Sequence, residues 1–198
     1  MILREKTMQT RTINSQFKTR EDGGTLRIEG YFAVFDSTTE LWPGAFESIA
    51  PGAFTEAITR DDVRALIDHE TMYVLGRNIS STLELREDER GLWGGILINP
   101  NDQDAMNLYA RVQRGDVSQC SFGFDILNEE TEFFEDGSIK WTIKEVKLYE
   151  VSVCTFPAYK ETEVEARKKD FEALRKRTIE ANKLKLREKL KKGKKENA

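Results

Sequence analysis

The sequence predicts a mainly β fold with a few helices, of the mixed α+β class, followed by a charged helical tail. The first observation is strand-like alternation of apolar residues, clearest at 26–35. The second is a charge asymmetry: residues 161–198 carry 14 Lys and Arg against 8 Asp and Glu, whereas residues 1–160 have a net charge of −10. We therefore expect a polar lead-in at 1–25, a β-rich domain at 26–160 and a basic helical tail at 161–198.

The first elements follow from local patterns. Residues 1–20 show no clear periodicity, so they form either a polar lead-in or an edge strand. Residues 26–35 alternate with period two and form a strand, and Gly30 in its middle indicates a bulge or bend. Two Pro-Gly pairs break residues 36–51, which predicts a loop, and a short helix is expected at 53–58.

The middle of the domain reads as further strands. Residues 63–69 are a short apolar-biased strand that ends on His69, the one histidine of the chain. Residues 82–86 and 92–98 are separated by the charged turn 87–91, which is typical of a hairpin.

The remaining elements are longer. Residues 103–114 place apolar side chains at helical spacing, with capping residues before them and Gly115 after them. Strands follow at 117–127 and 139–156, and the second is long enough to bend or to cross two sheet regions.

The tail, residues 161–195, contains no proline and is rich in good helix formers. Its apolar stripe is ragged, so three interpretations stay open: a solvated and partly frayed helix, a helix that binds an assembly partner or itself, and a segment that binds nucleic acid through its positive charge. Phe171 is its one aromatic residue, which argues against recognition of single strands.

Composition excludes several classes. There is no run of about 18 apolar residues, so no membrane span is expected. The charged N-terminus does not resemble a secretory signal, which places the protein in the cell where it is made. Cys120 and Cys154 are more simply read as small buried residues than as a disulfide framework. A single histidine excludes Cys/His zinc fingers.

Three residue types could together support nucleophilic catalysis. Ser121 lies on a predicted strand among small residues, with Gly123 two positions later. A serine hydroxyl needs a base to accept its proton, and His69 is the one imidazole available. The alternatives are a strand bulge at Ser121 and Gly123 and an ordinary surface or core histidine.

A third group must fix the tautomer of such a base. Glu150 lies in an otherwise apolar stretch, where a carboxylate costs free energy unless it is paired. It either orients the base or pairs with a lysine or arginine across the sheet. Asp68 is the rival orienting group, although adjacent residues of a strand point to opposite faces.

Short motifs in the chain resemble those of the prohead proteases of tailed bacteriophages, in the same order. They are GYFAVFD at 30–36, IAPGAF at 49–54, DH at 68–69 followed by LG at 75–76, GL at 91–92, SFGF at 121–124, EVS at 150–152 and TFPAY at 155–159. The resemblance spans about residues 26–160. This family is similar in fold to the herpesvirus capsid-maturation protease, which implies a closed β-barrel surrounded by a few helices.

The resemblance also implies roles. His69 matches the general base and Ser121 the nucleophile, while Ser118, three residues away, would lie on the opposite face of a regular strand. Herpesvirus enzymes use a second histidine as the third member, and this chain has none, so the orienting group is acidic, a water or absent; Glu150 is the choice. Backbone N–H groups at Phe122 and Gly123 are the expected oxyanion support. No metal or cofactor is needed.

The function implied is a serine endopeptidase that acts inside the assembling procapsid in the host cytoplasm. Its expected partners are the scaffolding protein or segment and the major capsid protein, and it would also cut itself. Herpesvirus relatives work as dimers, so the resemblance in fold implies, by analogy alone, that this chain forms a homo-oligomer. The basic tail would dock on scaffold; neither a membrane nor nucleic acid is the favoured partner. The alternative is a catalytically silent assembly or scaffold protein that holds capsid protein through its tail.

Overall fold

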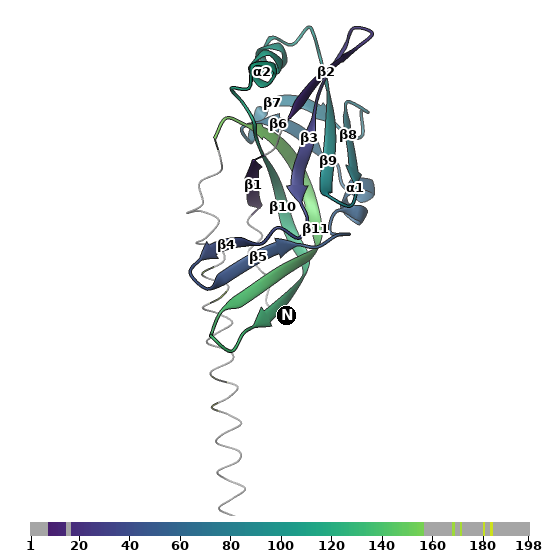
Figure 1. Cartoon of the computed structure of the whole chain (residues 1–198). Helices are drawn as coiled ribbons and strands as arrows, with labels where there is room; N and C mark the ends of the chain where they lie inside the picture. Colours follow the sequence, from purple (N-terminus) through teal and green to yellow (C-terminus); the bar gives the residue numbers. More distant parts are fainter. Residues whose placement is uncertain are drawn as a thin grey trace, which may run out of the picture. The chain divides into compact units, whose positions relative to one another are not determined.

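The computed structural model describes residues 8–14, 17–156 and four isolated tail positions, 168, 171, 180 and 183. The chain divides into two units, residues 1–159 and 160–198, and the first contains every element below (Figure 1). In chain order the elements are β1 (Gln9–Asn14), β2 (Lys18–Asp22), β3 (Thr25–Val34), β4 (Thr39–Trp42), β5 (Ala45–Ile49), α1 (Thr55–Arg60), β6 (Arg64–Ile67), β7 (Glu70–Arg77), β8 (Leu83–Glu87), β9 (Gly91–Ile98), α2 (Gln103–Arg114), β10 (Gln119–Phe133) and β11 (Ile139–Cys154).

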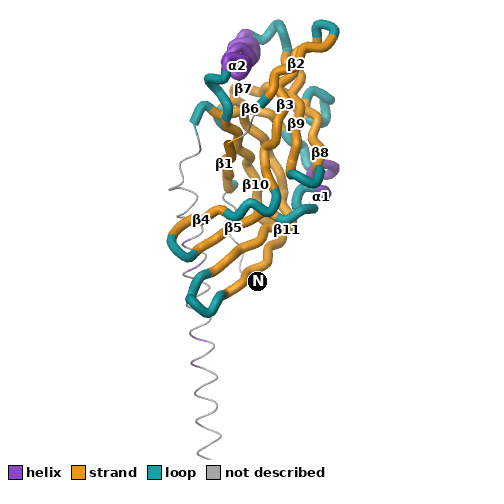
Figure 2. Tube along the Cα trace, viewed as in Figure 1, coloured by secondary structure: helices purple, strands orange, loops and turns teal. Residues whose placement is uncertain are grey.

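The strands form two sheets (Figure 2). One follows the order β1-β10-β11-β5-β4, and the other follows β2-β3-β9-β8. β10 pairs antiparallel with β11 over almost its whole length. β5 pairs with residues 139–143 of β11 and β6 with residues 150–153, both in parallel. β7 joins the sheet through β6. The long strand β11 thus spans two regions of one sheet, as its length predicted.

The closed β-barrel expected from the resemblance is not found. A barrel requires the ladder to return from its last strand to its first. Among the described strands, β1 and β4 end the path of one sheet, and β2 and β8 end the other. The fold is therefore mainly β with two helices in the described residues, built from two sheets that share a core.

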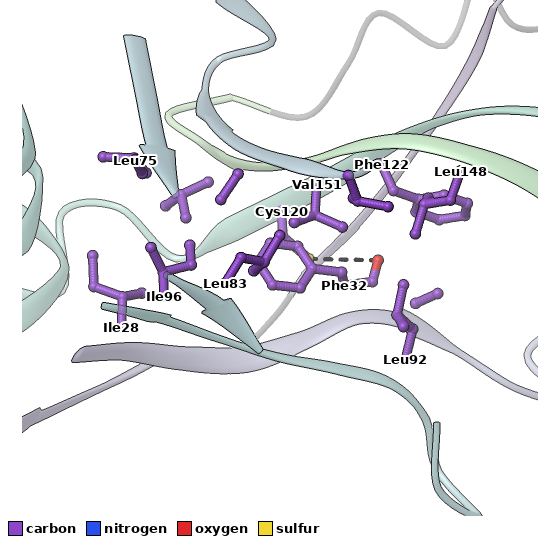
Figure 3. Packing of buried hydrophobic residues seen from close by; sticks show 14 of the residues in the cluster. Ile28, Phe32, Leu75, Leu83, Leu92, Ile96, Cys120, Phe122, Leu148 and Val151 are labelled. Atoms are coloured by element: carbon purple, nitrogen blue, oxygen red, sulfur yellow. Dashed lines mark hydrogen bonds between the residues drawn. The ribbon is translucent and has the colours of Figure 1, made fainter. Parts of the chain in front are cut away.

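Apolar side chains from both sheets meet in that core (Figure 3). Ile28 and Phe32 of β3 and Leu92 of β9 lie with Phe122 of β10 and Val151 of β11, all at 0% exposure. The central strands of the two sheets thus bury one face against the other sheet.

One irregularity in β11 sets which side chains face away from this core. Gly123 is opposite Glu150 and Phe124 is opposite Leu148, so Tyr149 is an extra residue in the ladder. Because of this bulge, both Leu148 and Val151 belong to the core cluster. Glu150 and Ser152 lie on the other face of the strand.

Several predicted elements are confirmed. β3 corresponds to 26–35, β8 and β9 form the expected antiparallel hairpin, and α2 occupies 103–114. Asp102 caps α2 by accepting hydrogen bonds from the N–H groups of residues 104 and 105, and Gly115 ends it with φ 87°.

Other predictions differ from the structure. The loop predicted at 36–51 is wrong, because β4 and β5 lie there and Pro43-Gly44 is only the turn between them. The predicted strand 63–69 ends at Ile67, and β7 follows after a two-residue turn. α1 begins at Thr55, two residues later than expected.

The N-terminal region contributes edge strands rather than only a lead-in. β1 lies at the edge of one sheet and β2 at the edge of the other. The predicted tail helix at 161–198 lies outside the described residues, apart from the four isolated positions. Within the described part of the chain, no helix has the length and apolar character to cross a membrane.

Candidate active site

His69 lies in the tight turn between β6 and β7. Asp68 and His69 both have positive φ, 48° and 63°, which is uncommon for residues other than glycine. The Asp68 carboxylate accepts hydrogen bonds from the N–H of Thr155 (2.7 Å) and from its hydroxyl (3.0 Å). Asp68, the rival orienting group, therefore fastens the turn to the end of β11.

The imidazole of His69 contacts Glu150. Its Nδ1 lies 2.8 Å from Glu150 Oε1, and the two side chains are 25% and 6% exposed. The other carboxylate oxygen, Oε2, accepts a hydrogen bond of 2.6 Å from the Ser152 hydroxyl. A neutral imidazole that donates from Nδ1 to this carboxylate keeps the lone pair on Nε2, the state a general base requires.

Ser121 lies on β10, directly opposite Ser152 of β11. Paired residues of adjacent strands project to the same face, so Ser121 shares the face of Ser152 and Glu150. Ser121 is 0% exposed, and its Oγ makes no hydrogen bond to any residue that the structure describes. Buried hydroxyls are nearly always hydrogen-bonded, so a buried serine without such a bond is a candidate for a functional role. Ser118, the other candidate, is exposed and precedes β10.

Gly123 faces Glu150 across the ladder. A Cβ atom at this position would lie 2.4 Å from Glu150 Oε1 and 3.1 Å from Met8 Sδ. Real Cβ atoms do not approach so closely, so the absent side chain leaves room for the carboxylate that contacts His69. Steric exclusion of a Cβ atom by the Glu150 carboxylate therefore explains why glycine stands two residues after Ser121.

Phe122 and Gly123 lie inside β10, between β1 on one side and β11 on the other. The Phe122 side chain packs in the core, against the Phe124 ring at a centroid distance of 4.8 Å. The role of their N–H groups as oxyanion donors stays a prediction.

Ser152 is a polar residue at the site to which the sequence analysis assigns no role. It is 0% exposed and also accepts a hydrogen bond of 3.2 Å from the N–H of His69. The signal for it was present: the Glu-x-Ser spacing in a strand places Glu150 and Ser152 on one face.

Cys154 is the nearby residue with another nucleophilic side chain. Burial, followed by the charges of Asp68 and Glu150, raises the pKa of the Cys154 thiol to about 12. The thiol therefore stays protonated at neutral pH and is a poor nucleophile. Among the described residues, no group of three or more His, Cys, Asp and Glu side chains could hold a metal ion.

The site contains the side chains that acyl transfer requires, although Ser121 Oγ makes no hydrogen bond to His69 in this structure. It combines a buried hydroxyl, a histidine on the same face of the sheet and a carboxylate bound to Nδ1 of that histidine. In this geometry each of the three predicted residues, His69, Ser121 and Glu150, comes from a different element: the β6–β7 turn, β10 and β11. These parts are the same as those of a Ser-His-carboxylate triad.

Comparison with known proteins identifies the family. Residues 14–177 match the model of the caudovirus prohead serine proteases. The chain is 31% identical over 156 residues to the prohead protease of Enterobacteria phage HK97, a match that covers 78% of this chain and 65% of that protein, slightly less than two thirds of its length. The fold is similar to that of the bacteriophage T4 capsid assembly protease, with a TM-score of 0.52 and 12% identity over 78% of this chain and all of that one. The chain belongs to the caudovirus prohead serine protease family.

Proposed function

We propose that this chain is a serine endopeptidase of phage procapsid maturation, with Ser121 as nucleophile, His69 as general base and Glu150 as orienting carboxylate. The observation that supports this most strongly is the pairing of His69 Nδ1 with Glu150 on the face of the sheet that also holds the buried Ser121 hydroxyl.

The proposed reaction proceeds by two acyl transfers. Ser121 Oγ attacks the scissile carbonyl carbon while His69 Nε2 takes its proton, and Glu150 stabilises the imidazolium. The tetrahedral intermediate collapses, the C–N bond breaks, and His69 gives the proton to the leaving amine. Water then attacks the ester carbonyl while giving a proton to His69, and a second tetrahedral intermediate forms. When it collapses, the bond between the carbonyl carbon and Ser121 Oγ breaks, His69 returns the proton to Oγ, and the acid product is released.

Backbone N–H groups at Phe122 and Gly123 are the proposed stabilisers of the oxyanion. Ser121 has no exposed surface in this structure, so a substrate carbonyl reaches its Oγ only after the covering residues move.

We further propose that the substrates are scaffolding segments, the leader of the major capsid protein, and the chain itself. The names of the two similar proteins, a prohead protease and a capsid assembly protease, support this class of substrate. Cleavage would take place inside the assembling procapsid, in the host cytoplasm. The basic tail at 161–198 would dock the enzyme on scaffold, and a tail-deleted chain that is packaged normally would refute that role.

The proposal is tested by co-expressing the chain with the major capsid protein of the same phage and measuring intact masses. We expect shortened capsid protein with the wild type and with Ser118→Ala, the control serine. Ser121→Ala and His69→Ala should give full-length chains. Equal, uncut masses for all four proteins would instead favour the alternative, a silent assembly protein.

A further inference from the structure

Ser152 is a fully buried serine in the middle of β11 that makes two hydrogen bonds. Its hydroxyl lies 2.6 Å from Glu150 Oε2, and its Oγ lies 3.2 Å from the backbone N of His69. No other serine in the described residues contacts both members of the His69–Glu150 pair.

The directions of these bonds follow from the groups involved. An ionised carboxylate only accepts hydrogen bonds, so the single hydroxyl hydrogen of Ser152 is donated to Glu150. An Oγ lone pair then accepts the N–H of His69. On its other side, Glu150 Oε1 accepts from His69 Nδ1. The three residues therefore close a ring of hydrogen bonds that runs from the His69 backbone, through Ser152 and Glu150, back to the His69 imidazole.

This ring fixes the imidazole relative to its own backbone. The turn at His69 has two successive positive φ values, a conformation that its surroundings must maintain. Thr155 holds Asp68, and Ser152 holds the N–H of His69. The Ser152 hydroxyl also limits rotation of the Glu150 carboxylate, because both carboxylate oxygens are bound at defined positions.

We propose that Ser152 is a positioning residue, which keeps the Glu150 carboxylate turned toward His69 Nδ1 and so keeps His69 in the tautomer with its proton on Nδ1 and its lone pair on Nε2. The proposal rests on the proposed function. A purely structural role is the competing explanation, in which Ser152 only satisfies buried polar groups.

The test combines spectroscopy and reactivity. Because His69 is the only histidine, ¹⁵N NMR of the labelled imidazole at pH 8 reports its tautomer without overlap. The rate at which diisopropyl fluorophosphate modifies Ser121 reports activation of the nucleophile without a peptide substrate. The variants are Ser152→Ala, Ser152→Cys and Ser152→Thr. The control is Ser48→Ala, another buried serine, whose Oγ lies 3.4 Å from Thr142 Oγ1.

In the wild type we expect the Nδ1–H tautomer. Ser152→Ala should give a mixture of tautomers and slow the modification roughly tenfold or more, since an unsatisfied buried acceptor allows Glu150 to reorient. Ser152→Cys, nearly equal in volume, should act like Ser152→Ala and serves if the alanine variant does not fold. Ser152→Thr, which keeps the hydroxyl, should retain the wild-type tautomer, as should Ser48→Ala.

The wild-type tautomer in folded Ser152→Ala or Ser152→Cys would overturn the proposal. So would a mixture of tautomers in folded Ser152→Thr. Because Ser152 acts on His69 by way of Glu150, Ser152→Ala should not slow the modification further in a chain that already carries Glu150→Gln. If Ser152→Ala slows the modification equally in the wild type and in Glu150→Gln, the proposal is also overturned. If wild-type Ser121 is not modified and the capsid protein co-expressed with the wild type is not cut, the proposed function fails, while the tautomer measurement still decides the role of Ser152.

Discussion

Gly123 and Glu150 face each other across the β10–β11 ladder, and a Cβ atom on Gly123 would lie 2.4 Å from Glu150 Oε1. The glycine two residues after Ser121 is therefore needed for the space that it leaves. That space holds the carboxylate oxygen that contacts His69, so a feature of the serine strand determines where the Glu150 carboxylate lies.

Replacement of Gly123 tests this steric role. We expect Gly123→Ala to displace the carboxylate and to lower the rate of peptide cleavage by about two orders of magnitude, because a displaced orienting group leaves the base in the wrong tautomer. Cleavage of the capsid protein, followed over time by gel, measures the effect.

The matched control is the same change in a chain that already lacks the carboxylate. In Glu150→Ala, the added methyl group has no oxygen to displace, so Gly123→Ala should cost little further activity. A second loss as large as the first would mean that Gly123 acts elsewhere, for example through its backbone.

Asp61 links α1 to β11 and should make stability depend on pH. Its Oδ2 accepts a hydrogen bond of 2.8 Å from the Leu148 N–H, and Oδ1 lies 2.8 Å from Arg60 Nε. Burial alone would raise the pKa of Asp61, but these hydrogen bonds outweigh it and lower the pKa below its ordinary value. The stabilisation is thus present above the ordinary pKa, about 4, and is lost as the pH falls through the lower pKa of the folded state.

We expect Asp61→Asn to lower the free energy of unfolding by about 1–3 kcal/mol at pH 7, and the difference from the wild type to shrink toward pH 3. Urea denaturation at both pH values measures this. Asp22→Asn, at an exposed ion pair with Arg20, is the control and should stay within about 0.5 kcal/mol of the wild type. A difference that grows toward acid would contradict the assignment.

The thiols should take no part in the reaction. Cys120 is buried with its Sγ 3.1 Å from the Tyr31 carbonyl oxygen, and the pKa of Cys154 is raised to about 12. We expect iodoacetamide at pH 8 to leave the folded protein unmodified and its proteolysis unchanged, and to modify both cysteines in urea. Rapid alkylation of Cys154 with loss of activity would point to a thiol nucleophile.

Local patterns predicted the elements that depend on local interactions. The hairpin of β8 and β9 has its turn in the sequence between two alternating strands, and α2 has its own caps. β5 was missed because Pro43-Gly44, the turn that joins it to β4, was interpreted as part of a loop. Its other partner, β11, pairs in parallel and lies 94 positions away, as in Ala45 opposite Ile139. No local signal records such a partner, and the same holds for the absence of barrel closure.

In the candidate site too, the sequence predicted the residues but not the contacts that depend on the fold. Residue chemistry and the family resemblance indicated His69, Ser121 and Glu150, and the structure places Glu150 against His69 although they lie 81 residues apart. The Glu-x-Ser spacing placed Ser152 on the face of Glu150, but its contacts with Glu150 and with the N–H of His69 depend on the fold. Its importance depends on the turn at His69, whose positive φ values could not be predicted from alternation.

The central claim is that Ser121 is the nucleophile and His69 its base. The most direct measurement is to treat the chain with diisopropyl fluorophosphate and to locate the added phosphoryl group by peptide mass spectrometry. We predict modification at Ser121 in the wild type and in Ser118→Ala, and a loss of modification in Ser121→Ala and His69→Ala. Modification at another serine, or at Ser121 equally fast without His69, would contradict this account.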